Sequence, residues 1–455
     1  MNQKLQNMAT MPLGRRHVWV VFVASLGQLI GTGVATLAGI IIPMLNIYLK
    51  PGISSAMQGI IGAMDLIGIM IGSVILGKMI DKYGYILLFR LCPALVLVAS
   101  VIAALIPNDI VLLVCLFFVG FGIGGEYSLD SNYISELMPV KWKSFMVGLA
   151  KTASAFGNII VAGVCYLLIL KWHAAKYWPD LMWISAVIAA VMLICRIWFY
   201  QSPKWLEEHG KQQEAEKMLQ KFLGPNVELA PEPKNVPASS TNQGSGKSFF
   251  RNNWRQIILT GIPWACEGLG VYGIGVFLPV LVMSLGIEHI EKGMLPIMHV
   301  ASSVEITFFI SCIILPGFLL GLWLINRKVN ICSMQTWGFL LCAGCLLILL
   351  FASDLHWPKW VSIVAFMAFE LFLNMGPHLV TYVLPPKVYP VATRGFGTGI
   401  AASLGKVGAV LGVFFIPVLL HSGGTNLVLI VSAVVMGLGA LVTFVFRHSA
   451  HDSIS

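Results

Sequence analysis

Long, uninterrupted apolar runs constrain this chain more than any other feature. Residues 18–49, for example, contain no charged side chain, and a helix of about 20 residues is enough to cross a bilayer. Of the 455 residues, 57% are hydrophobic and only 11% are charged, which is too few polar residues to cover a soluble domain. Because the runs lack the alternation of barrel strands, the sequence predicts an all-α integral membrane protein.

Twelve such runs are present, in two sets of six. Their approximate bounds are 18–48, 54–80, 86–107, 109–137, 142–170, 181–200, 255–286, 294–326, 330–352, 359–385, 393–420 and 425–446. The polar segment between the sets starts with an amphipathic helical pattern, SPKWLEEHGKQQEAEKMLQKFL, and continues in linker composition. We therefore predict an N-terminal six-helix half (1–200), a cytoplasmic central loop (201–254) and a C-terminal six-helix half (255–455).

Basic residues are distributed unevenly among the connections. With a cytoplasmic N-terminus, the outer side holds only Lys50, Lys171, Lys176, Lys292 and Lys359, and the other connecting bases are inside. Lysine and arginine accumulate in cytoplasmic loops, so we predict cytoplasmic termini and a place in the cytoplasmic (inner) membrane. This topology explains the net charge of +9 without nucleic-acid binding. The first run has no small-residue cleavage site, so we predict that it is a retained helix.

The connection between the second and third runs reads GKMIDKYGY. It resembles the loop motif of the major facilitator superfamily, Gly-x-x-x-Asp-(Arg/Lys)-x-Gly-(Arg/Lys): Gly77, Asp81, Lys82 and Gly84 match, and a tyrosine replaces the last base. With twelve runs in two halves, the chain is similar to this transporter superfamily. The resemblance implies that Asp81 braces the outward-open state from the cytoplasmic side.

A second pattern links the two halves. ELMPVKWKSFMVG follows the fourth run and KVYPVATRGFGTG follows the tenth; each has a proline, a base four residues later and a glycine nine residues later. Arg394 is the base of the second segment. Glu136 precedes the first segment's proline and lies beside Lys141 and Lys143 in sequence. We interpret Glu136 and Arg394, together with the loop motif, as gating residues.

Three further segments resemble particular branches of the superfamily. QSPKWL is similar to the signature after the sixth span of sugar and organic-ion porters, whereas GGEYSLDSNYISE and residues 376–409 resemble the phosphate:proton symporters. The resemblance makes Glu126 and Glu267 the acids of helices four and seven. It places Tyr127, Trp264 and Thr381 near a bound substrate. Ser154 and His378, which we also count as candidate substrate-binding residues, fall where the family has a glutamine in helix five and an asparagine in helix ten. The acidic residue that the family has in helix one has no counterpart in this chain. The first run of this chain instead carries three polar residues, of which Gln28 is the first.

Polar residues inside the runs are costly, so they should face a cavity or a partner. Glu126 and Asp130 are four residues apart and share one helical face. Four other runs carry polar faces: Gln28, Thr32 and Thr36; Lys151, Ser154 and Asn158; Asn374, His378 and Thr381; Ser403 and Lys406. We expect these faces to line one central aqueous cavity. Two bases favour an anionic substrate, and Glu126, Asp130 and Glu267 are the candidate proton carriers.

Structural alternatives remain open at several of these positions. Lys151 could neutralise Glu126 or Asp130 as a structural pair, and Lys406 could pair with an acid without touching substrate. His378 could be a packing residue, and Trp264 could lie at the membrane interface. Asp65 and Glu305, alone in the second and eighth runs, fit packing or gating better than ligand binding.

The sequence predicts a secondary active transporter: a monomer that couples entry of protons to symport of a small anionic solute, either phosphate or an organic metabolite. A sugar or polyol porter is the alternative, and a non-transporting membrane sensor is a further one. We find no nucleotide-binding motif and no catalytic triad spacing, so we predict neither an enzyme nor a cofactor. The nine cysteines lie mostly in apolar runs, and we predict no metal site and no disulfide framework.

Overall fold

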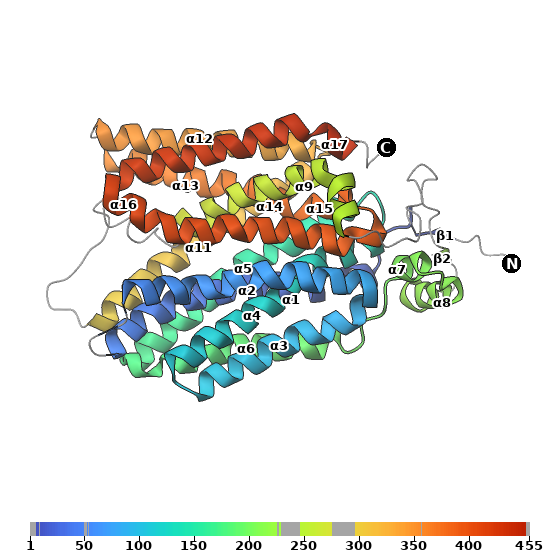
Figure 1. The fold of residues 1–455 in the computed structure, drawn as a ribbon, viewed down its shortest axis with the longest axis horizontal. Coiled ribbons are helices and arrows are strands. Elements are labelled where there is room, and N and C mark those ends of the chain that lie inside the picture. Colours follow the sequence, from blue (N-terminus) through green and yellow to red (C-terminus); the bar gives the residue numbers. More distant parts are fainter. Residues whose placement is uncertain are drawn as a thin grey trace.

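The computed structural model describes residues 6–8, 10–49, 52, 54–224, 227–228, 246–274, 296–355 and 357–451. Helices make up nearly all of this described part, and ten of them are long and apolar enough to cross a membrane. They lie roughly along one common direction (Figure 1). The prediction of an all-α membrane protein is confirmed.

The first six predicted runs correspond to the first long helices of the structure. These are α1 (Arg15–Tyr48), α2 (Ser55–Tyr83), α3 (Tyr85–Leu105), α4 (Asp109–Leu137), α5 (Lys143–Trp172), and α6 (Met182–Arg196), which follows the 3-10 turn η1 (Ala175–Leu181). Two of these helices have a side-chain N-cap: the Ser54 side chain caps α2, and the Asn108 side chain accepts from two backbone amides of α4. The helix α6 ends four residues before the predicted 200, and the Tyr200 carbonyl accepts instead from the Tyr133 hydroxyl.

The predicted amphipathic helix of the central loop is two helices. These are α7 (Pro203–Glu208) and α8 (Gln212–Leu223). The chain turns between them at Gly210, whose φ of 71° favours glycine, so the prediction of one continuous helix is wrong. Beyond α8, β2 (Val227–Glu228) pairs in parallel with β1 (Gln6–Asn7). Residues 229–245 lie outside the described residues.

The remaining helices belong to the predicted C-terminal half. They are α9 (Gly246–Gly268) with the π-helical turn η2 (Leu269–Ile274), α11 (Pro296–Asn326), α12 (Ile331–Asp354), α13 (Lys359–Met375), α14 (Pro377–Val383), α15 (Pro385–Val388), η3 (Val391–Thr393), α16 (Arg394–Phe446) and α17 (His448–His451). The rest of the predicted seventh run, 275–286, lies outside the described residues. Below, α1–α6 are the first half and α9–α16 the second half.

The tenth predicted run differs from the helices that form. The tenth run is broken into α13, α14 and α15, because Pro377 and Pro385 cannot donate the hydrogen bonds that would continue the helix. The eleventh and twelfth runs form two helices of membrane-spanning length, Val391–Phe415 and Ser422–Phe446, which share the label α16 and are separated by a kink at Gly424, where φ is 66°. The first break places Asn374 and His378 beside an interrupted backbone inside the bundle.

Contacts between the halves run through α2 with α16 and α5 with α11, while α4 packs against α2 within the first half. Small residues allow the backbones of α2 and α4 to approach closely. A Cβ added at Gly72 would lie 2.2 Å from the Phe121 carbonyl oxygen, and one at Gly120 would lie 2.0 Å from that of Asp65. This packing holds α4 rigidly in the centre of the first half.

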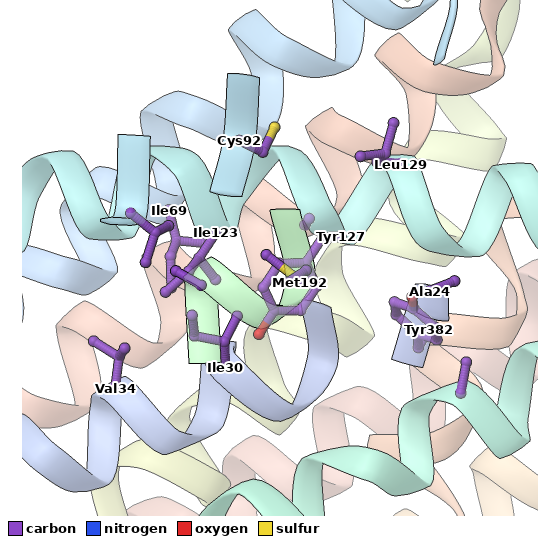
Figure 2. Close-up of a cluster of buried hydrophobic side chains, with 14 of the residues drawn as sticks. Ala24, Ile30, Val34, Ile69, Cys92, Ile123, Tyr127, Leu129, Met192 and Tyr382 are labelled. Carbon is purple, nitrogen blue, oxygen red and sulfur yellow. The ribbon is translucent and has the colours of Figure 1, made fainter. Parts of the chain in front are cut away.

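Figure 2 shows the apolar cluster that surrounds the middle of α4. Side chains from α1, α2, α3 and α6 converge on it, among them Ile30, Ile69, Cys92 and Met192. Tyr127 of α4 lies within this cluster, and Tyr382 contributes from α14 of the second half. The cluster therefore joins the two halves next to the polar residues of α4.

One end of the bundle carries β1, β2, α7, α8 and α17 (Figure 1). We call it the loop end. The start of α1 and the helix α17 share this end, so the two ends of the described chain lie on the same side. That the loop end faces the cytoplasm stays a prediction from the lysine and arginine distribution.

Candidate functional site

The two acids of α4 form a buried charge cluster with Arg196 of α6. Arg196 Nη1 lies 2.8 Å from Glu126 Oε1 and 2.6 Å from Oε2, and Nη2 lies 2.9 Å from Asp130 Oδ1. All three side chains are fully buried, and the guanidinium carbon lies 4.9 Å from the centre of the Phe89 ring. With all three groups ionised, one positive and two negative charges leave a net charge of −1.

Arg196 is the residue that sequence reasoning missed. The alternative in which Lys151 neutralises Glu126 or Asp130 is wrong, because Arg196 takes that role and Lys151 Nζ lies 3.4 Å from Gln28 Oε1. The two acids on one apolar helix indicated that a buried cation was needed, but Arg196 and Lys151 are both bases in apolar runs and the sequence did not choose between them.

The two carboxylates of α4 are not held equally. Both oxygens of Glu126 accept from Arg196, whereas only one oxygen of Asp130, Oδ1, does so. Gly27 of α1 permits this arrangement, because a Cβ there would lie 2.1 Å from Asp130 Oδ2. Asp130 therefore keeps one oxygen that Arg196 does not bind, at the contact between α1 and α4.

A second cluster joins the halves through aromatic rings and two lysines. Lys151 Nζ of α5 lies 5.5 Å from the centre of the Tyr127 ring, and Lys406 Nζ of α16 lies 5.0 Å from it. Lys406 also donates to the Tyr272 hydroxyl at 2.6 Å, and Lys151 lies 5.6 Å from the ring of Tyr382. One base from each half thus interacts with the same ring.

Trp264 of α9 completes this aromatic cluster, and the alternative of an interfacial position is wrong. Its side chain is 5% exposed, and its ring lies 5.9 Å from that of Tyr127. Gly405 makes room for the indole, since a Cβ there would lie 2.6 Å from it. Tyr127 and Trp264, which the resemblance placed near a substrate, are therefore neighbours.

An acid and a histidine lie close to the two lysines. Glu267 Oε1 is 3.5 Å from His378 Nδ1, and Glu267 interacts electrostatically with Lys151 and Lys406. Thr381 does not join them; its hydroxyl donates to the carbonyl of His378 on its own helix. A further acid of this half, Glu370, accepts from Asn374.

The expected open cavity differs from the observed arrangement. Five of the side chains that were to line it, Gln28, Lys151, Ser154, His378 and Lys406, are at most 8% exposed, whereas Thr36, Asn158 and Ser403 are half-buried. Thr32 donates to the Ser154 carbonyl and Thr36 to Asn158, so the polar faces of α1 and α5 bind each other. Between the halves, the rings of Tyr127, Tyr272 and Tyr382 lie against the two lysines.

At the loop end, Asp81 joins the halves. Its carboxylate oxygens accept from the amides of Gly395 and Phe396, each at 2.8 Å, at the start of α16. These amides are unpaired by the helix itself and carry its positive dipole end, so a carboxylate is well matched to them. Gly77 allows the approach, since a Cβ there would lie 2.5 Å from the Gly395 carbonyl oxygen.

Glu136 makes the second connection at this end, with a partner other than its neighbours in sequence. It accepts from Arg394 at 3.3 Å, from the Tyr85 hydroxyl at 2.6 Å and from the Ser202 hydroxyl at 2.5 Å. Arg394 also donates to the Tyr389 carbonyl. The adjacency of Glu136 to Lys141 and Lys143 in sequence therefore did not identify its ion-pair partner.

The segment QSPKWL supports both connections. The Gln201 side chain accepts from the Tyr85 amide at 2.8 Å, and the Trp205 indole donates to the Asp81 carbonyl at 3.0 Å. Gly84 has a φ of 80° and a Cβ there would collide with Gln201, which explains the glycine of the motif. Lys82, in contrast, is exposed, and its ammonium group lies 5.0 Å from the centre of the neighbouring Tyr83 ring.

Comparison with known proteins identifies this architecture. The family described as "Sugar (and other) transporter" matches residues 16–449. The chain belongs to this transporter family. It is therefore a multi-pass membrane transporter of small-molecule solutes in the major facilitator superfamily, as its resemblance implied, and its relatives are transporters rather than enzymes.

The relatives of this transporter differ in their named solutes. It is 23% identical to the inner membrane metabolite transport protein YgcS of Escherichia coli, over 98% of this chain and 94% of the relative. It is 24% identical to the probable inorganic phosphate transporter 1-6 of Arabidopsis thaliana, over 89% and 84%. The structure of the proton:xylose symporter XylE of E. coli has a TM-score of 0.76 at 19% identity, with 95% of each chain covered.

Proposed function

We propose that this transporter carries a small anionic solute, phosphate or an organic metabolite, together with protons by alternating access. The observation that supports this most directly is the placement of Lys151 and Lys406, one from each half, against the ring of Tyr127. Such a site between the halves, near mid-membrane, is where transporters of this architecture bind their solutes.

The charges around this site favour an anion. Two ammonium groups buried near one ring repel each other and have lost their water, so an anion placed between them would offset both costs. Glu267 supplies one negative charge nearby. Because the lysines belong to different halves, a bound anion would link the halves through their contacts with it, which is a requirement for coupling binding to alternating access.

Proton coupling is proposed at the cluster of Arg196 with the acids of α4. The cluster carries one uncompensated negative charge, which one bound proton would remove. Asp130 is the favoured carrier, because Arg196 binds only one of its oxygens while it binds both oxygens of Glu126. Glu126 is the second candidate and Glu267 the third.

The anion site is tested by uptake into proteoliposomes with a panel of solutes that includes phosphate, organic acids and sugars. The double variant Lys151→Ala, Lys406→Ala should lose affinity for the transported anion by a hundredfold or more, since two charge-assisted contacts of about 1.5–3 kcal/mol each are removed. Lys171→Ala is the control, an exposed base on the same helix as Lys151. Unchanged affinity of a folded double variant would refute the site.

Proton coupling is tested by accumulation against a gradient. With the membrane potential held at zero, entry of one proton with one monovalent anion supports about tenfold accumulation per pH unit, because both correspond to about 1.4 kcal/mol. Asp130→Asn should abolish this accumulation and retain exchange of solute across the membrane. If Asp130→Asn still accumulates solute and Glu126→Gln does not, Glu126 is the carrier; if both accumulate it, the cluster has no part in coupling.

A sugar or polyol is the second candidate solute. The rings of Tyr127, Trp264, Tyr272 and Tyr382 give the site a strongly aromatic surround, which suits the apolar faces of a sugar. The same panel of solutes separates the two candidates. If a neutral sugar competes for uptake, and if removal of the two lysine charges leaves that competition unchanged, the sugar is favoured.

A further inference from the structure

A second basic site lies at the loop end, far from the cluster around Tyr127. A cavity of about 500 Å³ opens there between the α4–α5 turn, the end of α11, the start of α12, and α15 and α17. The bases among its lining residues are Lys141, Lys328, Lys387, Arg447 and His448. None of the described lining residues is acidic.

The positive charges of this cavity are not neutralised by the described protein. Within the described residues, none of the five bases forms an ion pair with a carboxylate. Lys141 and Arg447 instead lie over the rings of their near neighbours in sequence, Trp142 and Phe444. Predicted topology explains why bases are common at this end, but it does not require them to surround one cavity.

The end of α11 requires a left-handed backbone conformation at Lys328, where a lysine stands in place of the usual glycine. Lys328 has a φ of 58° and ends α11 in a pair of hydrogen bonds, from its own amide to Ile325 and from Val329 to Leu324. Glycine is the usual residue at this position of such a cap. A lysine held there places a cation at the cavity at a conformational cost, and such strain is concentrated at functional sites.

Both halves contribute to the cavity. Lys141, Ser144 and Phe145 come from the first half, and Lys328, Lys387 and the other lining bases come from the second half or follow it. A multivalent anion in the cavity would therefore contact both halves at the end where Asp81 and Glu136 also join them. Its binding would oppose separation of the halves at the loop end.

We propose that this cavity is a regulatory site for a phosphate-bearing polyanion that holds the loop end closed. The hydroxyls of Ser144 and Ser333 and the amides of Asn326 and Asn330 supply neutral donors beside the bases, which matches the mixture of charged and neutral donors that phosphate groups accept. A soluble phosphorylated compound and the headgroup of an anionic lipid share this chemistry. The proposal is independent of the solute that the central site carries.

The test uses the purified full-length transporter in neutral detergent with inorganic pyrophosphate as the probe. Pyrophosphate should raise the melting temperature, and potassium chloride at equal ionic strength should not. Lys328→Gly should raise the melting temperature without ligand, because glycine relieves the backbone at φ of 58°, and should weaken pyrophosphate binding at least tenfold. Lys387→Ala should weaken it similarly.

Two control variants make the result specific. Lys171→Ala, Lys176→Ala removes two exposed bases from outside the cavity lining and should leave pyrophosphate binding unchanged. Lys151→Ala, Lys406→Ala should also leave it unchanged, which separates this site from the central one. Binding that falls in either control as much as in the cavity variants, or that survives in Lys328→Gly, Lys387→Ala, would overturn the proposal.

The lipid source is tested in nanodiscs. Wild-type protein should be more stable in phosphatidylglycerol than in phosphatidylcholine, and the cavity variants should lose the difference, if a headgroup occupies the site. Stabilisation by pyrophosphate alone assigns the site to a soluble anion. If neither probe distinguishes wild type from the cavity variants, the cavity binds no such anion and the proposal fails.

Discussion

Replacing Arg196 with methionine should strongly destabilise the protein. The change removes the partner of two fully buried carboxylates, including the contacts of 2.6 Å to Glu126 and 2.9 Å to Asp130. Removing one member of a buried ion pair costs about 3–5 kcal/mol, because the charge left behind has neither partner nor water. Free energies of unfolding from titrations of detergent-solubilised protein with sodium dodecyl sulfate would measure the loss.

Replacing the whole cluster should restore most of that stability. A triple variant with Arg196→Met, Glu126→Met and Asp130→Leu has no charge left to bury, and apolar replacements of buried ionic triads are often neutral or stabilising. Recovery to within about 1 kcal/mol of wild type is expected, together with loss of proton-driven accumulation. The recovery would show that charge compensation, and not packing of the arginine stem, caused the single variant's loss.

Matched controls define what would refute this reasoning. Arg90→Met removes an exposed arginine of α3, and a surface change of this kind should cost less than about 0.5 kcal/mol. Lys151→Met should cost less than Arg196→Met, because Lys151 donates at 3.4 Å to Gln28 and lies over two rings, but forms no ion pair with a carboxylate among the described residues. Two results would show that Arg196 is not the counter-ion of the acids. One is a loss of unfolding free energy in Arg196→Met no larger than that in Arg90→Met, and the other is a larger loss in Lys151→Met than in Arg196→Met.

Three further predictions concern packing, the loop end and topology. Gly27→Ala should cost about 1–3 kcal/mol in the same unfolding titration, because its Cβ would meet Asp130 Oδ2 at 2.1 Å; an unchanged value would contradict the close contact. Asp81→Asn should speed hydrogen exchange of the Gly395 and Phe396 amides about tenfold, since hydrogen bonds to charged groups contribute about 1.5–3 kcal/mol. Mass spectrometry would measure the exchange rate, and an unchanged rate would contradict the prediction. Single cysteines placed in residues 229–245 should react only with permeant reagents in intact cells, and labelling by an impermeant reagent from outside would reverse the predicted orientation.

The sequence alone established the membrane class and most of the helices. An apolar run of sufficient length forms a helix in lipid, because every backbone amide and carbonyl must then find its hydrogen-bond partner within the same segment. The motif around Asp81 likewise pointed to a contact at one end of the bundle. The breaks at Gly210 and Pro377 could have been inferred from local chemistry, since a glycine and a proline interrupt helices for reasons that belong to the residues themselves.

The partners of the buried charges were decided by the tertiary structure. In sequence, Arg196 is a base near the end of an apolar run, a position where long side chains commonly reach toward the membrane surface. It points instead to Glu126 and Asp130, 70 and 66 residues away. Lys151 was the nearer candidate along the chain, and nothing local distinguished the two bases.

The same reason applies to the centre of the protein and to the loop end. Tyr127 meets Lys151 and Lys406 only because two halves, each formed from its own helices, pack against each other. Glu136 likewise forms an ion pair with Arg394, which is 258 residues away in the sequence. Helix formation depends on residues a turn apart and can be read along the chain, whereas the pairing of charges depends on which helix faces meet, and that is set by the packing of the whole bundle.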